Sequence, residues 1–219
     1  MSLSYAASVL SDFPELVSAT LIVDGVHAGA DVGHLVEPFI VRAKARLAGA
    51  SEAEFPEIQA WRRAFSRMGL KPTQYRCASE ALLRRLRQDG ALPSLHPLVD
   101  FCNAVSVAFA IPVAVFDRSR IAGRLAVRPA DGNETYETFQ GAIEQPHPRE
   151  IIFADAERRV HARRWTNRQS GLSAVRATTT TVLIVAEALH DQAEADVPRL
   201  IATLTDGIAT AFPGCECQP

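Results

Sequence analysis

Two carboxylates and an amide occur at a spacing suited to a binding or catalytic site: Asp100, Asn103 and Asp117. Asp100 and Asn103 lie three positions apart in a segment with helical character, which places both side chains on one helix face. Asp117 ends a short apolar run that follows Pro112, as at the end of a strand. Such side chains can hold a ligand or orient a reacting group. The structural alternative is that Asp100 and Asn103 cap a neighbouring backbone and that Asp117 stabilises a turn.

A second polar group follows further along the chain, where residues 168–171 read Arg-Gln-Ser-Gly. A polar run that ends on glycine is typical of an ordered loop beside a site. The threonines at 178–181 come next, and their β-branched side chains predict a strand. If one face of that strand is buried, its hydroxyls need partners, so these threonines are candidates for lining a pocket.

Several kinds of site are excluded. The sequence lacks the motifs of nucleotide-phosphate loops, dinucleotide folds, zinc proteases and serine hydrolases. The six histidines never occur as an i, i+4 pair, the spacing that binds a metal from one helix. Cys215 and Cys217 form a Cys-x-Cys pair without a second pair of ligands nearby, and the simpler interpretation is a reduced tail. We therefore expect no metal and no cofactor.

Composition restricts the class of protein. The chain of 219 residues is 47% hydrophobic with a net charge of -2, which indicates a packed core and excludes a disordered chain. The charge is not that of a general nucleic-acid binder, so contact with RNA requires a local patch. No apolar run reaches the roughly 18 residues of a membrane span, and residues 1–10 lack the basic start of a secretory signal. We expect a cytoplasmic protein without membrane contact.

The elements that must position these residues are both helices and strands. Apolar periodicity predicts helices over 32–47, 57–68, 79–86, 97–110 and 196–212, the third with Ser79 as N-cap and Gly90 as its stop. β-Branched runs predict strands over 19–26, 113–116, 124–128 and 177–185, and hairpins over 133–141 and 150–165. No repeat or flexible linker divides the chain. We predict one α+β domain over residues 1–219.

The region from residue 75 to about 190 resembles the B-three/B-four domain of the phenylalanyl-tRNA synthetase beta subunit. Residues 1–74 are expected to be the N-terminal part of the same domain. Trp61, Lys71-Pro72 and Arg163-x-Trp165 are similar to free-standing relatives of that domain, which carry no synthetase core. The matches follow the family's order: the helix of 79–86, Val99-Asp100-x-x-Asn103 after a proline, Pro112 to Phe116-Asp117, Ile121-x-Gly123, Val127-Arg128, Gly132-x-Glu134, Gly141, and the strand that ends on Asp155.

The resemblance implies an editing-domain fold, with helices packed on a mixed or antiparallel sheet, and hydrolysis of mischarged tRNA. It implies no use of ATP, because nothing in the chain resembles a synthetase core. The family's hydrolysis relies on orientation and on the terminal hydroxyl of the tRNA, and Asn103, Arg168 and Gln169 are suitable donors for such a site. The substrate pocket is expected to include Asp100, Ala114, Asp117, Ser170, Thr178, Thr179 and Thr180.

Two positions depart from the family's pattern. Ala114 stands where the family has a histidine, two residues before the Phe-Asp pair. Arg168 falls at or near a glutamate that reads the hydroxyl of tyrosine, and a guanidinium cannot accept a hydrogen bond from a phenol. We therefore expect deacylation of a different, small or polar amino acid. The alternative is a module that binds tRNA or an amino acid without catalysis.

Contact with tRNA or aminoacyl-tRNA, the expected partner, would depend on arginines, since phosphates dominate binding to RNA. The alternative is that these arginines only form a solvated helix face and a charged hairpin edge. The predicted tRNA-binding residues are Arg76, Arg84, Arg85, Arg163 and Arg164.

Overall fold

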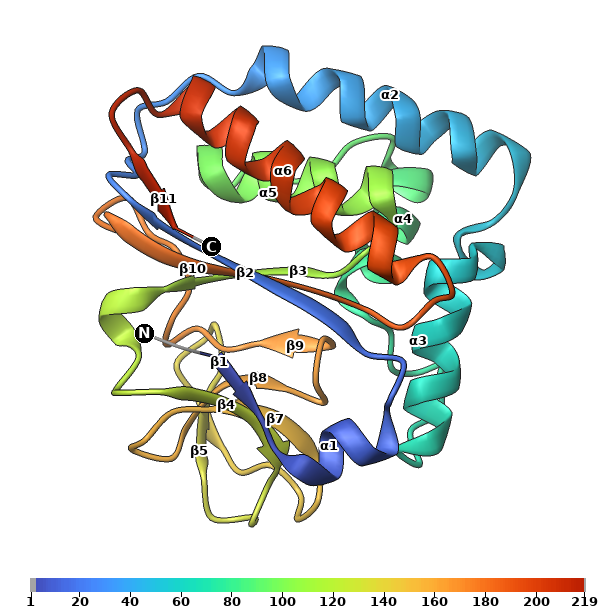
Figure 1. Ribbon diagram of the computed structural model, residues 1–219, viewed down its shortest axis with the longest axis vertical. Coiled ribbons are helices and arrows are strands. Elements are labelled where there is room, and N and C mark those ends of the chain that lie inside the picture. Colours follow the sequence, from blue (N-terminus) through green and yellow to red (C-terminus); the bar gives the residue numbers. More distant parts are fainter. Residues whose placement is uncertain (1–2, 219) are drawn as a thin grey trace.

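The computed structural model describes residues 3–218, and in that range a layer of helices, a four-stranded sheet and a seven-stranded sheet are stacked on one another (Figure 1). No helix in this range has the length and apolar character needed to cross a membrane. The architecture is mixed α+β, as the sequence predicts.

The four-stranded sheet forms the middle layer. Its central strand β10 (Thr181–Ala188) lies between β2 (Val17–Asp24) and β3 (Val113–Asp117), and β11 (Glu216–Gln218) extends the sheet beyond β2, with every pair antiparallel. Side chains alternate between the two faces of a strand. Ile184 accordingly packs toward the helices, whereas Val185 packs toward the other sheet.

Helices α5 (Pro97–Phe109) and α6 (Ala193–Ala211) pack on the outer face of this sheet, and α2 (Gly33–Gly49) packs against α5 (Figure 1). The His96 side chain caps α5 by accepting a hydrogen bond from the Leu98 amide at 3.2 Å. The helices α3 (Pro56–Arg67) and α4 (Ala78–Asp89) lie beside the sheets, and the short α1 (Ala7–Asp12) follows the first strand.

The seven-stranded sheet forms the third layer. Its parallel edge pair joins β1 (Leu3–Tyr5) to β4 (Leu125–Pro129), and β7 (Ile151–Ala154) continues the sheet in antiparallel fashion to β8 (Arg159–Arg163). β8 also pairs with β5 (Thr135–Glu137) and with the short β9 (Arg168–Gln169), and β6 (Ile143–Glu144) completes the hairpin with β5. Short 3-10 turns occupy Glu52–Glu54 and Arg118–Arg120.

Two local predictions are wrong. The threonine strand starts at Thr181 rather than at residue 177, because Thr179 turns back: its hydroxyl accepts from the Arg176 amide at 2.9 Å and donates to Asp117 at 2.7 Å. Ser79 lies inside α4 rather than at its N-cap, which is Cys77, and the Ser79 hydroxyl donates to the Ala110 carbonyl at 3.0 Å. Gly90 ends α4 in the left-handed conformation, as predicted.

Candidate functional site

A small cavity lies between the two sheets, where β3 and β10 face β7, β8 and the loop that follows β8. Its volume is about 60 Å³, which is room for roughly four water-sized groups. The start of α4 closes one side. The lining residues are Ala78, Pro112, Val113, Ala114, Phe153, Ala162, Trp165, Thr166, Asn167, Gln169, Val185 and Glu187.

Strand alternation determines which residues of the middle sheet reach this cavity. Ala114 on β3 is paired in register with Val185 on β10, and Glu187 is the next residue of β10 on the same face. Ala114 leaves space that a larger side chain would fill. The register of one strand pair therefore brings together the cavity's apolar floor and its carboxylate.

The loop after β8 forms the opposite wall and is fixed to several elements. Arg164 and Trp165 both have positive φ, at 47° and 59°, a conformation that costs non-glycine residues about 1–3 kcal/mol. The Trp165 amide donates to the Ile151 carbonyl at 2.7 Å, and the Thr166 carbonyl accepts from the Ala78 amide at 2.8 Å. These bonds hold the loop in its strained form.

Two amide side chains continue this wall. Gln169 Nε2 donates to the Val115 carbonyl at 2.7 Å, which ties β9 to β3 across the gap between the sheets. Asn167 Nδ2 donates to the Arg76 carbonyl at 2.7 Å. The cavity thus has walls that are already positioned before a ligand arrives, a favourable condition for binding by preorganised groups.

Glu187 is the one carboxylate among the residues that line the cavity in the described part of the chain, and it is 2% exposed. Its Oε1 accepts hydrogen bonds from the Tyr5 hydroxyl at 2.7 Å and from Trp165 Nε1 at 2.8 Å. Burial raises the pKa of Glu187 to about 7, against the two hydrogen bonds that lower it. The carboxyl is therefore poised between its neutral and ionised forms near neutral pH.

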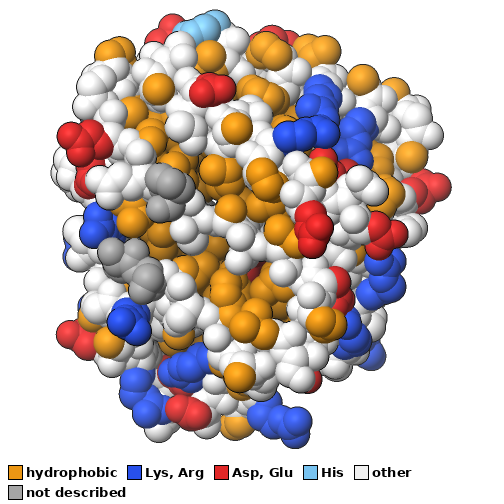
Figure 2. Space-filling view, viewed as in Figure 1, with side chains coloured by type: hydrophobic (Ala, Val, Ile, Leu, Met, Phe, Trp, Pro, Cys, Tyr) orange, Lys and Arg blue, Asp and Glu red, His pale blue; other side chains and the backbone are white. Residues whose placement is uncertain are grey.

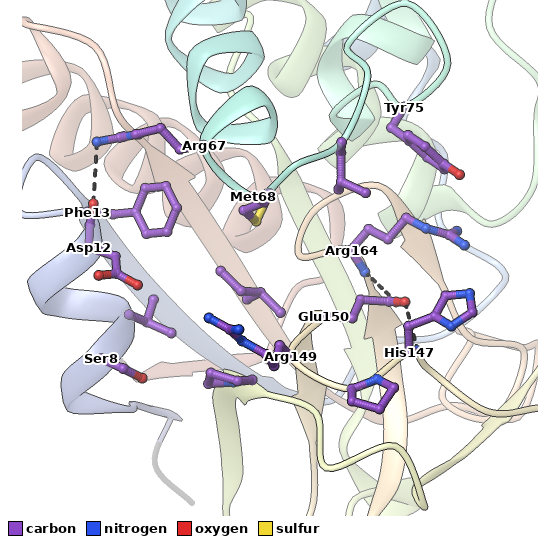
Figure 3. A pocket seen from close by; sticks show the side chains of 15 residues that line it. Ser8, Asp12, Phe13, Arg67, Met68, Tyr75, His147, Arg149, Glu150 and Arg164 are labelled. Atoms are coloured by element: carbon purple, nitrogen blue, oxygen red, sulfur yellow. Dashed lines mark hydrogen bonds between the residues drawn. The ribbon is translucent and has the colours of Figure 1, made fainter.

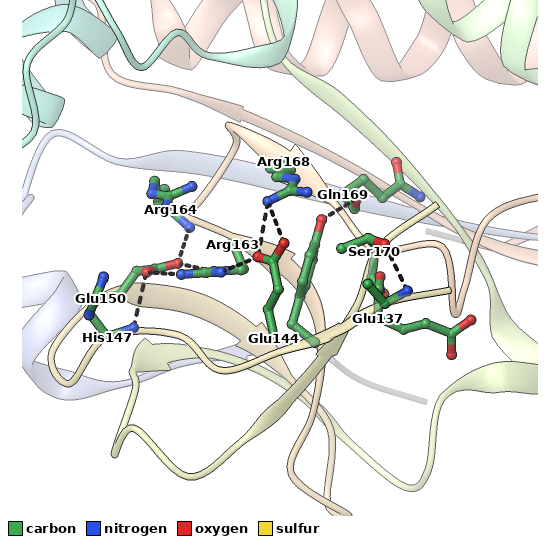
Figure 4. Close-up of polar contacts among 12 residues, drawn as sticks. Glu137, Glu144, His147, Glu150, Arg163, Arg164, Arg168, Gln169 and Ser170 are labelled. Carbon is green, nitrogen blue, oxygen red and sulfur yellow. Dashed lines mark hydrogen bonds and ion pairs between the residues drawn. The ribbon is translucent and has the colours of Figure 1, made fainter. Parts of the chain in front are cut away.

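The structure brings two of the predicted site residues together, since Ala114 and Gln169 both line the cavity. Asn103, on α5, and Arg168, on β9, are not among its lining residues. The Arg168 guanidinium instead pairs with Glu144 at 3.0 Å (Figure 4). It also lies over the Tyr136 ring, 5.3 Å from the ring centroid.

Among the other predicted pocket residues, Asp100, Asp117 and Ser170 bond to backbone groups, and for Asp100 and Asp117 this agrees with the structural alternative. Asp100 accepts from the Ser94 hydroxyl and the Leu95 amide, both at 2.8 Å, and so fixes the loop before α5. Asp117 accepts from the Ser119 amide at 3.0 Å and from Thr179. The Ser170 hydroxyl donates to the Glu137 carbonyl at 2.7 Å. Thr178 and Thr180 are exposed outside the strand.

The predicted RNA-binding arginines occupy different environments. Arg163 is buried between Glu150, at 2.9 Å, and Glu144, at 2.7 Å, and so is engaged within the protein (Figure 4). Arg84 and Arg85 on α4 keep 42% and 56% of their side chains exposed. Arg76 is 3.6 Å from Glu80 with 29% of its side chain exposed, and Arg164 stacks on the Tyr75 ring.

A buried Ser-His-Asp chain has some geometry of a hydrolase triad. Ser173 Oγ lies 2.8 Å from His161 Nδ1, and His161 Nε2 lies 3.3 Å from Asp155. Ser173 and His161 are fully buried, and neither belongs to the lining of the cavity. Burial lowers the pKa of His161 despite the neighbouring Asp155. A nucleophile must reach its substrate, so these three buried residues stabilise the fold and do not take part in catalysis.

A larger open cleft of about 780 Å³ lies between α1, the end of α3 and the segment before β7 (Figure 3). Arg67 and Phe13 lie on one side and His147 and Arg164 on the other, with Arg149 between them (Figure 3). Phe13 packs edge-on against Trp165, with ring centroids 4.9 Å apart. Trp165 lines the small cavity, so this aromatic pair separates the two spaces.

The surface around these elements is mixed in character. On the face shown in Figure 2, apolar side chains gather down the middle, and Lys and Arg side chains lie toward the edges. Such a distribution gives local rather than global positive charge, in keeping with the net charge of -2.

The sequence did not lead us to predict Thr166, Trp165 and Glu187 as residues of the site. Glu187 carries a signal that was available, because it is the one charged residue in the apolar strand Thr181–Ala188. A carboxylate in a strand buried on both faces requires partners. Trp165 and Thr166 carry no comparable signal, since their role depends on the loop conformation.

Comparison with known proteins gives consistent matches. The family model of the B3/4 domain matches residues 60–205. The Phenylalanine--tRNA ligase beta subunit of Tropheryma whipplei (strain Twist) is 37% identical over 75 residues, which are 34% of this chain and 8% of that protein. This chain thus spans less than a tenth of that relative.

A solved structure extends the likeness to nearly the whole chain. The crystal structure of an N-terminal fragment of the phenylalanyl-tRNA synthetase beta-subunit from Pyrococcus horikoshii has a TM-score of 0.55 at 11% identity, and the match covers 99% of this chain and 50% of that one. At this identity the likeness is one of fold.

Proposed function

Because this chain belongs to the B3/4 domain family, we propose that it binds tRNA and hydrolyses the ester of a mischarged aminoacyl-tRNA in trans. The observation that carries the proposal is the cavity between the sheets, which unites Ala114 and Gln169. Those two positions come from the segments in which the resemblance to editing domains implies a substrate pocket. The acyl group would enter this cavity.

The proposed reaction needs only water. A water oxygen adds to the ester carbonyl carbon, the bond to the terminal ribose oxygen breaks, and a proton passes to that oxygen, which leaves a free amino acid and deacylated tRNA. No histidine, cysteine or serine occurs in the cavity lining of the described chain, so we assign no protein nucleophile. Gln169 and Thr166 are the donors best placed to stabilise the oxyanion.

The size and chemistry of the cavity favour a small amino acid over tyrosine. A volume of about 60 Å³ does not accommodate a phenol ring. Arg168 stands at or near the family's tyrosine-reading glutamate, and its guanidinium is engaged by Glu144. Both features support selection against large aromatic substrates.

Arg76 and Arg164 are the arginines best placed to contact the tRNA end. Asn167 of the cavity wall bonds to the backbone of Arg76, and Arg164 directly precedes Trp165 in the same wall. Each is within one or two residues of the cavity lining, so a phosphate bound there would lie near the scissile ester.

The test is deacylation of a panel of tRNAs mischarged with small, polar and aromatic amino acids. Ala114→Leu fills the cavity, and Ala202→Leu makes the same change on an exposed site of α6 as a control. We expect the wild type and Ala202→Leu to release small amino acids, and Ala114→Leu to lose release while still binding tRNA. A folded wild type that hydrolyses nothing across the panel overturns the enzymatic proposal.

The alternative is a module that binds tRNA or an amino acid without catalysis. The absence of a histidine at position 114 favours it, because that position carries the family's editing histidine. Filter binding at two salt concentrations separates the alternatives: salt-sensitive tRNA binding without deacylation supports the module. Absence of RNA binding even at low salt contradicts both tRNA-dependent proposals and leaves only the binding of a small molecule such as an amino acid.

A further inference from the structure

A buried carboxylate without a cationic partner faces the cavity. Within residues 3–218, both hydrogen bonds to Glu187 end on Oε1, and no arginine, lysine or histidine pairs with this carboxylate. Buried carboxylates are ordinarily paired with a cation, because an isolated charge in the interior is costly. The other oxygen, Oε2, is thus available to a ligand in the cavity.

Two neighbours orient this carboxylate. Tyr5 comes from β1 of the larger sheet, and Trp165 comes from the strained loop after β8. Trp165 is fully buried and Tyr5 is partly buried, and both donate to the same oxygen. A carboxylate held by two donors presents its second oxygen in a defined direction, as a preorganised acceptor does.

A second polar group in the same wall lacks a partner. Across the described chain, Thr166 Oγ1 is one of the few buried side-chain oxygens without a hydrogen bond. Buried hydroxyls are nearly always paired, so an unpaired one beside a cavity indicates a ligand or a bound water. Thr166 and Glu187 together give the cavity one hydroxyl and one acceptor.

Building on the proposed function, we propose that Glu187 binds the α-amino group of the aminoacyl moiety, with its ammonium as the missing cation. An α-ammonium is compact, carries three donors, and is common to all aminoacyl esters apart from proline. Pairing it with a buried carboxylate gives a charge-assisted hydrogen bond, which is stronger than a neutral one. The amino acid's side chain would then occupy the small remaining volume.

The sharpest variant is Glu187→Gln, because the new amide oxygen can still accept from Tyr5 and Trp165 while its NH₂ group replaces Oε2. An NH₂ group donates and cannot accept from an ammonium. Glu137→Gln makes the same change on β5, outside the cavity lining, and serves as a matched control.

Binding is measured with alaninamide and N-acetylalaninamide by ligand-observed NMR, which requires no hydrolysis. We expect wild type and Glu137→Gln to bind alaninamide and to reject the acetylated form. We expect Glu187→Gln to bind alaninamide roughly tenfold to a hundredfold more weakly, the loss typical of one charge-assisted hydrogen bond. Equal binding of both amides by the wild type, or no binding of either, overturns the proposal, even where Glu187→Gln fails to fold.

Hydrolysis provides the second arm and separates this proposal from the proposed function. With alanyl-tRNA and N-acetylalanyl-tRNA, we expect the wild type to deacylate only the free-amino form, with Glu187→Gln raising KM more than it lowers kcat. Deacylation of both forms at equal rates contradicts the role of Glu187 and leaves the deacylase proposal standing. Binding of alaninamide without any deacylation supports the role of Glu187 and contradicts the deacylase proposal.

Discussion

The Tyr5 hydroxyl donates to Glu187 Oε1 at 2.7 Å, which joins β1 of the larger sheet to β10 of the middle sheet. The two residues are 182 positions apart in the sequence. Burial and the nearby carboxylate raise the pKa of Tyr5 well above its ordinary value, so the phenol remains a donor at any physiological pH. The contact thus links the N-terminal strand to the wall of the candidate site.

Tyr5→Phe removes this donor and keeps the ring. We expect the free energy of unfolding to fall by about 1–2 kcal/mol, the usual cost of leaving a buried acceptor with one bond fewer. Urea denaturation measures the change. Tyr75→Phe is the control, because the Tyr75 ring lies under Arg164 and that stacking survives the change. Equal stability of wild type and Tyr5→Phe would show that the bond contributes nothing.

The raised pKa of Glu187 predicts a pH dependence of stability. Because its pKa is about 7 in the folded protein and 4.5 ordinarily, the folded state holds the proton more tightly than the unfolded state. This contribution is complete below about pH 4.5 and is lost as the pH rises through 7. It amounts to on the order of 3 kcal/mol at most.

Denaturation midpoints of wild type and Glu187→Gln between pH 5 and pH 8 check this prediction. The difference between the two proteins should shift in favour of the variant as the pH rises, because glutamine does not ionise. A constant difference across this interval would mean that Glu187 keeps its ordinary pKa. The hydrogen bond from Tyr5 stabilises the ionised form of Glu187, so its loss in Tyr5→Phe raises the pKa of Glu187. The pH dependence of stability should therefore shift to higher pH in this variant.

Arg163→Met should be strongly destabilising. Arg163 is 5% exposed in its side chain and pairs with Glu150, which is 6% exposed, so its removal leaves a buried carboxylate without its cation. Such a loss costs about 3–5 kcal/mol. Arg85→Met is the control. Arg85 and Asp89 lie 3.4 Å apart, and their side chains are 56% and 58% exposed. Loss of such a surface pair costs about 1 kcal/mol or less. Similar unfolding energies for the two variants would contradict the assignment.

Gly171→Ala tests the turn that follows Gln169 at the end of β9. A Cβ at Gly171 would lie 2.6 Å from the Thr138 carbonyl oxygen and 3.1 Å from Phe139 Cα, both backbone atoms. We expect a loss of about 1–3 kcal/mol of stability from this overlap, together with weaker binding of alaninamide. The same substitution at Gly49, the last residue of α2, meets nothing within 4 Å and should be neutral or slightly stabilising. Thermal denaturation and the NMR assay report both effects.

Several features follow from the sequence alone because they depend on near neighbours. The helix of α5 is set by Pro97 at its start, by the His96 cap and by an apolar run of suitable period. Gly90 ends α4 because glycine adopts the left-handed conformation without steric cost. The β-branched run from Thr181 makes β10 recognisable, although its first residue depends on the Thr179–Asp117 contact.

The contents of the site depend instead on which segments meet in three dimensions. The family resemblance pointed to position 114 and the polar run to Gln169, and both line the cavity, but Arg168 is engaged by Glu144 and Asp100 by the loop before α5. Glu187 acquires its surroundings from the packing of the two sheets, which brings Trp165 and Tyr5 within hydrogen-bond distance of it. Local sequence determines the elements through nearby backbone and side-chain preferences. The chemistry of the cavity is determined by long-range strand pairing and burial, which no local pattern encodes.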